Sequence, residues 1–486
     1  LPTPHSPLPM LHRTRPTPYL TAAIALAVLA LAFLLGLRAS PLWLGLLVAG
    51  LGALALLAKP TLGLFALVAA ALFIPLQFGT GSDVTVNPVT LLIPAVALVW
   101  LLDQVRRGQV RVVPSPVNLP LTLFLGASLL SLLIGRATWD PFVAVKGNFL
   151  LVQLAQWGIF AFSALALWLT ANLVTDQRTL WRLTAFFLLL GGGVAIARTI
   201  PGLGGLLGRV TTAAFIRAPF WVLLAALAGG QLLWNRQLSL AWRGFLIAAL
   251  LATLVYALVD QQEAASNWVG IGAVAGVLVW LRFPRLRGPL VALVLILALL
   301  GVLAPAVYDF AGGENEWNES GGSRLVLIER VVDVTMRNPI TGLGPAAYRP
   351  YANATPLRYQ GANWLAPTVN SHNNYVDIFA HSGLLGLALF GWFVLEITRL
   401  GTRLHRRYTT GFAAAYVNGM LAAGAGALVI MMFADWILPF VYNIQFVGFQ
   451  ASVLVWLFLG GLVALENMRG GEGERGRGRE REEVRG

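Results

Sequence analysis

Residues 444–465 have the sequence IQFVGFQASVLVWLFLGGLVAL, an apolar run without a charged side chain. A helix of about 20 residues is long enough to cross the hydrocarbon layer of a bilayer, which is roughly 30 Å thick. Inside that layer every backbone N–H and C=O group needs a partner within the protein, so only helices or a closed barrel can cross. The apolar residues are continuous instead of alternating, which favours a helix. The stretch therefore predicts a transmembrane helix.

Comparable runs occur along nearly the whole chain, whose 486 residues are 57% hydrophobic and only 11% charged. A water-soluble protein carries about 25% charged residues. We therefore predict an all-α integral membrane protein with roughly 14 transmembrane helices. Their expected positions are 19–37, 41–58, 61–76, 88–103, 118–135, 147–171, 183–200, 218–234, 244–260, 267–282, 288–306, 383–398, 411–433 and 444–465.

The distribution of basic residues predicts the orientation of these helices. If the N-terminus is cytoplasmic, most arginines fall in cytoplasmic segments, as is typical of membrane proteins. These segments contain Arg13, Arg15, Lys59, Arg106, Arg107, Arg111, Arg178, Arg182, Arg236, Arg243, Arg282, Arg285, Arg287, the arginines of 399–407 and those of the C-terminal tail. We expect both termini inside. The net charge of +13 then follows from membrane orientation, and no nucleic-acid partner is predicted.

Five segments follow from this topology. We expect a cytoplasmic N-terminal segment, transmembrane helices 1–11, one long external loop with short amphipathic helices, transmembrane helices 12–14, and a disordered, Gly-rich cytoplasmic tail. Their bounds are 1–18, 19–306, 307–382, 383–465 and 466–486. The basic start leads directly into the first span, so no cleavable signal peptide is expected. Cysteine is absent, which excludes disulfides, thiolate metal sites and cysteine nucleophiles.

The external loop contains most of the residues that can support chemistry. The spacing of Leu325, Ile328, Val332 and Met336 predicts an amphipathic helix over 323–337, near the membrane interface. Pro339 should end it, and the sequence Gly-Leu-Gly-Pro that begins at residue 342 favours a tight turn. The acidic residues Glu314, Glu316 and Glu319 have oxygen ligands for a hard cation, but a solvated turn is the favoured interpretation, so no metal site is predicted.

Arg324 opens the amphipathic segment, and an external arginine runs against the charge bias of membrane proteins. Its guanidinium group is suited to a bidentate grip on pyrophosphate. The alternative is an arginine that binds lipid head-groups or a loop carbonyl.

His372 lies near a predicted helix start, after the candidate caps Asn370 and Ser371. A histidine in the first turn, at the outer surface, can accept a proton near neutral pH. The alternative is a histidine that is only hydrogen-bonded. His381 is four residues from Asp377, and we expect this pair to fix a tautomer.

The chain resembles the O-antigen ligase and polymerase superfamily over roughly residues 140–400. Arg324 comes first, Asn-Pro-Ile-Thr-Gly-Leu-Gly at 338–344 follows, then Ser-His-Asn-Asn-Tyr at 371–375 and Ser-Gly-Leu-Leu-Gly at 382–386. The resemblance implies a bacterial cytoplasmic-membrane enzyme that transfers a glycan from a polyprenyl-pyrophosphate donor, with inversion and without a metal or cofactor. The acceptor is a glycan, a lipid or a protein.

The resemblance also implies site residues. His372 corresponds to the family's essential histidine and Arg324 to one of its two essential arginines; we add Asn373 and Tyr375 as substrate-binding candidates. The family's other arginine has no counterpart in the stretch 260–268, so Arg209 or Arg217 in the preceding outer loop is predicted to replace it.

Two other functions stay open. A lipid-linked oligosaccharide flippase can have a similar number of spans, but transporters usually show repeated halves and ionisable residues at mid-membrane, and neither is evident. A catalytically inactive relative is the other alternative, because the arginine of 260–268 is missing.

Overall fold

The structure is a computed structural model that describes residues 50–52, 54–260, 265–300, 324–354, 357–359, 362–364 and 369–468. The chain divides into two units, 1–59 and 60–486, and the fold below is that of the second. The predicted span 19–37, most of 41–58, the acidic residues 314–319 and the tail beyond 468 lie outside the described residues.

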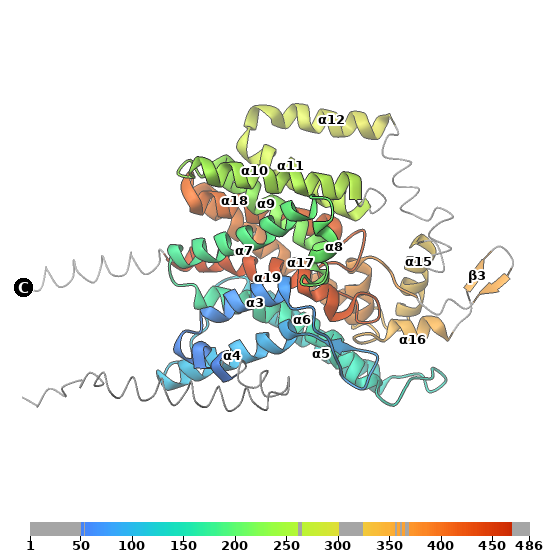
Figure 1. Ribbon diagram of the computed structural model, residues 1–486. Helices are drawn as coiled ribbons and strands as arrows, with labels where there is room; N and C mark the ends of the chain where they lie inside the picture. The colour runs from blue at the N-terminus through green and yellow to red at the C-terminus, as the bar shows by residue number, and fades with distance from the viewer. Residues whose placement is uncertain are drawn as a thin grey trace, which may run out of the picture. The chain divides into compact units, whose positions relative to one another are not determined.

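Helices dominate the second unit (Figure 1). The longer ones are α3 (Leu62–Phe73), α4 (Pro88–Arg106), α5 (Asn118–Ala137), α6 (Phe149–Leu173), α7 (Gln177–Arg198), α9 (Ala218–Trp234), α10 (Leu240–Val255), α11 (Ala265–Arg282), α12 (Arg287–Leu299), α15 (Arg324–Thr335), α17 (Asn374–Arg407), α18 (Gly411–Ile430) and α19 (Gln445–Met468). The short ones are α8 (Leu203–Leu207), η1 (Ala213–Ile216), η2 (Tyr256–Asp260), η3 (Pro284–Leu286) and α16 (Tyr348–Asn353). Two antiparallel hairpins complete the list, β1 (Phe78–Gly79) with β2 (Thr85–Val86) and β3 (Leu357–Tyr359) with β4 (Ala362–Trp364).

Eight described helices are long and apolar enough to cross a membrane, or nine if one bent pair forms a single span. The bent pair is α11 with α12, which turns by 120° at a short break. The predicted all-α membrane class is confirmed. The predicted number of roughly 14 spans is not, since α12 turns away from α11 and the first two predicted helices lie largely outside the described residues.

The helix bundle is centred on α19, whose most apolar stretch is 94% buried, against 22% for α4. Glycines let its neighbours approach closely. A Cβ at Gly460 would overlap the Leu167 carbonyl of α6, and one at Gly230 of α9 would overlap the Ala415 carbonyl of α18. Small residues at helix contacts are the usual means of close packing in membranes. The core of this unit therefore excludes lipid from α19.

The long helix α17 has a break at Gly383, whose φ is +66°. The turn at 338–344 docks on this break: Leu343 N–H donates to Ala380 O at 2.9 Å, and Leu384 N–H donates to Pro339 O at 2.8 Å. A Cβ at Gly342, φ +78°, would overlap the backbone of Ser382 and Gly383. The two glycine motifs singled out in the sequence are thus each other's packing partners, and glycine is required at both.

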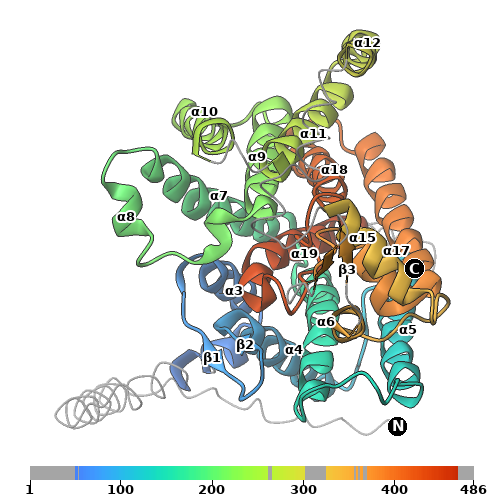
Figure 2. The ribbon, with the colours of Figure 1, turned by 90° about the vertical axis from the view of Figure 1, so that its right-hand side faces the viewer.

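The predicted amphipathic helix is confirmed as α15, from Arg324 to Thr335. Its buried face is formed by Leu327, Val331 and Val334, whereas Leu325 and Met336 are exposed. The apolar face predicted from Leu325, Ile328, Val332 and Met336 is therefore not the face of the helix that packs against the protein. In Figure 2, α15 and α16 lie at the end of the bundle that faces the viewer.

Candidate functional site

The site is organised by the connection between α18 and α19, residues 431–444, with the sequence MMFADWILPFVYNI. Although it is not helical, it is largely buried, including Asp435, Leu438 and Phe440. The Asp435 carboxylate stabilises its fold by accepting hydrogen bonds from Phe440 N–H at 2.8 Å and from Asn443 Nδ2 at 2.7 Å. Buried backbone groups need partners, and the connection obtains several from distant segments.

The turn that contains His372 is attached to the start of this connection. Asn374 N–H donates to Met431 O at 2.8 Å, and the Asn373 amide donates to Met432 O at 3.1 Å. The Tyr375 hydroxyl donates to Leu428 O at 2.8 Å, in the last turn of α18. Asn373 and Tyr375 therefore hold the turn against the end of α18.

The helix cap predicted at Asn370 or Ser371 was wrong by two to three positions. Asn373 is the N-cap of α17, and its side chain accepts from the N–H groups of Tyr375 and Val376. His372 consequently precedes the helix instead of lying in its first turn, and it is half-buried with φ +48°. A non-glycine residue at positive φ is uncommon and is often found at functional sites.

The buried carboxylate of Asp377 stabilises the turn that contains His372. The Ser371 hydroxyl donates to Asp377 Oδ1 at 2.6 Å, and the Tyr348 hydroxyl donates to the same oxygen at 2.9 Å. Burial and the neighbouring Asp377 carboxylate raise the pKa of Tyr348 well above its ordinary value. Tyr348 thus remains a hydrogen-bond donor at physiological pH.

The predicted pairing of His381 with Asp377 was wrong. Asp377 is bonded to Ser371 and Tyr348, and neither ring nitrogen of the buried His381 has a side-chain hydrogen-bond partner among the described residues. The imidazole is packed among aromatic rings instead, stacked on Tyr348 at 5.4 Å and beside Phe440 at 5.5 Å. It acts as a packing side chain.

Two of the three predicted arginines meet at the connection. Arg324 Nη1 donates to Phe433 O at 2.9 Å. The Arg217 guanidinium lies over the Trp436 ring, 5.2 Å from its centre. Burial lowers the pKa of Arg217, and the neighbouring Asp435 carboxylate and Tyr256 phenol partly offset this effect. An arginine side chain stays cationic in a protein. Arg209 lies exposed after α8, and no contact between it and the connection appears in the described part of the chain.

Two polar residues of the site were missed by sequence reasoning. Asp435 lies in the short stretch between two predicted apolar spans, and we did not consider it as a site residue. An ionisable residue in such a place often indicates a functional site. Arg349, in the sequence Tyr-Arg-Pro-Tyr, bonds the other end of the connection: Nη1 donates to Tyr442 O at 2.8 Å and the guanidinium lies 4.8 Å from the Tyr442 ring. A polar cavity of about 680 Å³ adjoins Arg349 and Tyr442.

The arrangement brings two cations and the turn that contains a potential base to one segment. Residues 432–436 contact Arg217, Arg324 and Asn373, the residue after His372. These three residues come from distant parts of the chain: Arg217 precedes Arg324 by more than a hundred residues, and α15 and α16 lie between Arg217 and Asn373. No group of three His, Asp or Glu side chains suited to a metal ion occurs among residues that the structure describes.

Residues 249–391 match the family model described as O-Antigen ligase. The matched range contains Arg324 and His372 but ends before the connection, and Arg217 precedes it. The match confirms the predicted resemblance to the O-antigen ligase and polymerase superfamily. A comparison with curated proteins finds none that matches the chain.

Proposed function

We propose that this chain, which matches the O-antigen ligase family at 249–391, transfers a saccharide from a polyprenyl-pyrophosphate carrier to a glycan, lipid or protein acceptor. The observation that carries the proposal is the meeting of Arg217, Arg324 and the His372 turn at residues 432–436. A leaving pyrophosphate needs fixed positive charge, and an acceptor hydroxyl needs a base. These residues supply both.

In the proposed reaction the acceptor oxygen attacks the anomeric carbon from the face opposite the pyrophosphate. The new C–O bond forms as the bond between that carbon and the pyrophosphate oxygen breaks, so the configuration inverts. The His372 imidazole takes the proton of the acceptor hydroxyl. The pyrophosphate leaves with the bonding electron pair toward Arg324 and Arg217, whose guanidinium groups suit bidentate contacts with phosphate.

Asn373 and Tyr375 support this site in a different way from the one predicted first. Their side chains bond to the Met432 and Leu428 carbonyls, so we propose that they position His372 on the connection. Direct contact of these two residues with substrate stays a prediction. The replacement of the missing family arginine is assigned to Arg217 instead of Arg209, because Arg217 is the one beside Trp436.

We further propose that the end carrying α15 and α16 faces the outside of the cytoplasmic membrane. The cysteine-free chain allows a direct test. Asn353→Cys should react with a membrane-impermeant thiol reagent in intact cells, whereas Gln109→Cys, in the connection between α4 and α5, should react only after permeabilisation. Equal reaction of both variants would overturn this orientation.

The function is tested with purified protein, a polyprenyl-pyrophosphate-linked saccharide and an acceptor, with EDTA present. Arg324→Ala and Arg217→Ala should each lower the transfer rate by roughly 10²- to 10³-fold, the usual cost of losing one group that stabilises the leaving charge. Arg209→Ala is the matched control and should transfer at the wild-type rate.

Two outcomes would contradict the assignment. An unchanged rate in Arg217→Ala would exclude Arg217 as the second cation, and loss of wild-type activity on adding EDTA would refute the metal-free mechanism. Movement of the donor across the bilayer without its consumption would instead support the flippase alternative, and neither movement nor transfer would indicate an inactive relative.

A further inference from the structure

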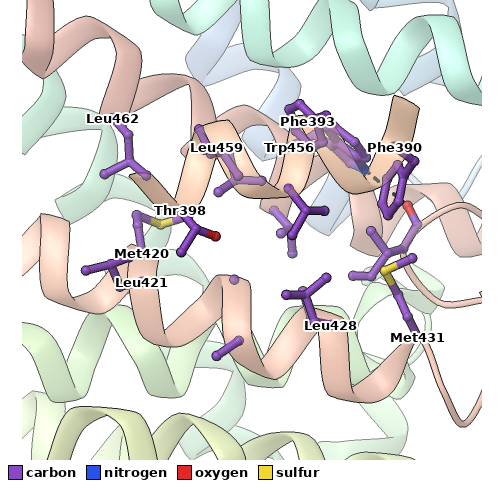
Figure 3. Close-up of a pocket in the computed structure, with 17 residues that line it drawn as sticks. Phe390, Phe393, Thr398, Met420, Leu421, Leu428, Met431, Trp456, Leu459 and Leu462 are labelled. Atoms are coloured by element: carbon purple, nitrogen blue, oxygen red, sulfur yellow. Dashed lines mark hydrogen bonds between the residues drawn. The ribbon is translucent and has the colours of Figure 1, made fainter. Parts of the chain in front are cut away.

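A polar cavity of about 310 Å³ lies among the ends of α7, α9, α10 and α18. The cavity between α17 and α18 is a useful contrast, since it adjoins the candidate site through Met431 and its lining, which includes Phe390 and Leu428, is almost wholly apolar (Figure 3). The lining of the polar cavity includes side-chain amides and hydroxyls, from Thr184, Gln231, Asn235, Gln237 and Ser239. The polar cavity is therefore suited to a hydrophilic group.

The polar cavity lies at the membrane interface opposite the candidate site. Phe412, which lines it, is in the first turn of α18, whereas the carbonyls that hold the His372 turn are at the other end of this helix. From Phe412 to Ile430 the helix rises by roughly 27 Å at 1.5 Å per residue. This is close to the thickness of the hydrocarbon layer, about 30 Å. Trp181, another lining residue, is 43% exposed, and tryptophan is typical of membrane interfaces.

The start of α10 borders the cavity. Ser239 is the N-cap of this helix, and its hydroxyl accepts from Trp242 N–H at 3.3 Å. Both residues line the cavity. The first N–H groups of a helix lack partners within it and carry partial positive charge, so they favour an anion such as phosphate.

Gln231 gives an independent indication that the cavity takes a ligand. The side chain lines the cavity and is only 3% exposed. Its Oε1 accepts from Asn235 Nδ2 at 2.8 Å, but its Nε2 has no hydrogen-bond partner among the described residues. A buried donor without a partner is costly. An acceptor atom of a bound molecule would satisfy it.

Arginines surround the opening of the cavity. Arg236 is exposed between two lining residues, and Arg243 Nη2 donates to the Arg236 carbonyl at 3.0 Å. Arg178 is exposed three residues before Trp181, so it lies on the same face of α7, one turn nearer the helix end. Asp176 is the neighbouring acidic residue, and its carboxylate caps α7. The charge at the opening therefore favours an anionic ligand.

We propose that this cavity binds the head group of an anionic phospholipid, with its phosphate at the start of α10 and its polar end toward Gln231. The volume equals that of about ten water molecules at roughly 30 Å³ each, which suits a glycerophosphate head group and excludes two acyl chains. The acyl chains pass over the exposed Trp181 and Leu240 into the bilayer. Such a lipid joins four helices at the interface opposite the candidate site, and the inference is independent of the proposed function.

The test measures Kd by native mass spectrometry of full-length protein in an uncharged detergent, titrated with dioctanoyl phosphatidylglycerol or dioctanoyl phosphatidylcholine. The wild type should bind phosphatidylglycerol about tenfold more tightly than the zwitterionic lipid. Arg178→Gln and Arg236→Gln should each raise the Kd for phosphatidylglycerol about fivefold, the usual contribution of one basic residue near an anionic lipid. Neither change should alter the Kd for phosphatidylcholine by more than about twofold.

The matched control removes the same charge at two exposed arginines that do not line the cavity, Arg106 and Arg285. The double variant Arg106→Gln/Arg285→Gln should bind phosphatidylglycerol as the wild type does. Equal affinity of the wild type for the two lipids, or an equal loss in this control, would overturn the inference.

Ala185→Leu separates the cavity from general attraction to surface charge, because it fills part of the cavity and leaves every charge in place. Its Kd for phosphatidylglycerol should rise about tenfold, since the added side chain occupies the volume of the head group. An unchanged Kd would show that the lipid is held by surface charge alone and would overturn the cavity assignment. Glycerol 3-phosphate that binds the wild type as tightly as phosphatidylglycerol would identify a soluble ligand and overturn the lipid assignment.

Discussion

The long loop before α17 and the short connection between α18 and α19 have opposite compositions and complementary parts in the site. The described loop residues include Arg324 and His372, whose guanidinium and imidazole groups are the ones proposed to act on the substrate. The connection is apolar and buried, and its carbonyls at 432 and 433 hold Asn373 and Arg324. Reactive side chains and the scaffold that positions them therefore come from different segments.

The last carbonyls of a helix explain this division. A helix leaves about four C-terminal carbonyls without intrahelical partners, and these carry partial negative charge. In α18, which ends at Ile430 with Met431 as its C-cap, the carbonyls of Leu428 and Met431 accept from the Tyr375 hydroxyl and from Asn374 N–H. The carbonyls of Met432 and Phe433, just beyond the helix, accept from Asn373 and Arg324. The residues that follow His372 therefore cap α18, and the same turn is held at the site by these contacts.

The largest expected effect concerns the chemistry assigned to the loop. His372→Ala should reduce the transfer rate by roughly 10²- to 10⁴-fold, the contribution of a positioned general base. Thermal stability and binding of undecaprenyl pyrophosphate should stay near wild type, because the bonds of Asn373, Asn374 and Tyr375 still hold the turn to α18 and to the connection.

His381→Ala is the control for this experiment, since it removes a buried histidine packed on Tyr348 and Phe440. It should lower the unfolding temperature more than His372→Ala does. A His372→Ala protein with full transfer activity would remove the base assignment and leave Arg324 as the chemical group proposed for the described part of the loop.

Next in size is the effect of weakening the connection itself. Asp435→Asn keeps the size of the side chain but loses the charge that accepts from Phe440 N–H and Asn443. Hydrogen bonds to charged groups contribute about 1.5–3 kcal/mol each. We expect the free energy of unfolding to fall by about 2 kcal/mol, with a parallel fall in transfer, measured by denaturant titration and by the transfer assay. A change in rate at unchanged stability would mean that Asp435 acts in the chemistry, which would break the division between the two segments.

Much of this fold could be predicted because transmembrane helices are determined by local sequence. The expected spans 118–135, 147–171 and 218–234 agree closely with α5, α6 and α9. The 120° turn between α11 and α12 could not be predicted, because apolar composition does not distinguish a crossing helix from one that turns aside.

For the candidate site, residue types in the sequence indicated which side chains could take part, but the sequence did not reveal where those side chains lie in the fold. His372 and Arg324 could be singled out because polar residues are rare in such a chain. The choice of Arg217 over Arg209 required the position of Trp436, and the failed pairing of His381 shows that spacing of four on a helix does not ensure contact. The break at Gly383 and the bonds of Asp377 to Ser371 and Tyr348 depend on segments far apart in sequence.

The smallest expected effect lies where the loop meets a third segment, at the ion pair between Arg337 and Asp140, 2.8 Å apart. The backbone N–H of Phe142 and then Arg337 hold the pKa of Asp140 below its ordinary value. A lowered folded-state pKa means that the ionised carboxylate stabilises the fold above the unfolded pKa, about 3.9, and that this contribution is lost as the pH falls through the folded pKa. Asp140→Asn should therefore lower the unfolding temperature slightly at pH 7, and the difference from wild type should begin to shrink as the pH falls through about 3.9 and vanish below the folded-state pKa of Asp140. Since exposed ion pairs contribute little and are screened by salt, the difference at pH 7 should also shrink at high ionic strength. A difference that persists at low pH would show that the side chain matters through its shape, and a large loss of transfer would place this junction inside the site instead of at its edge.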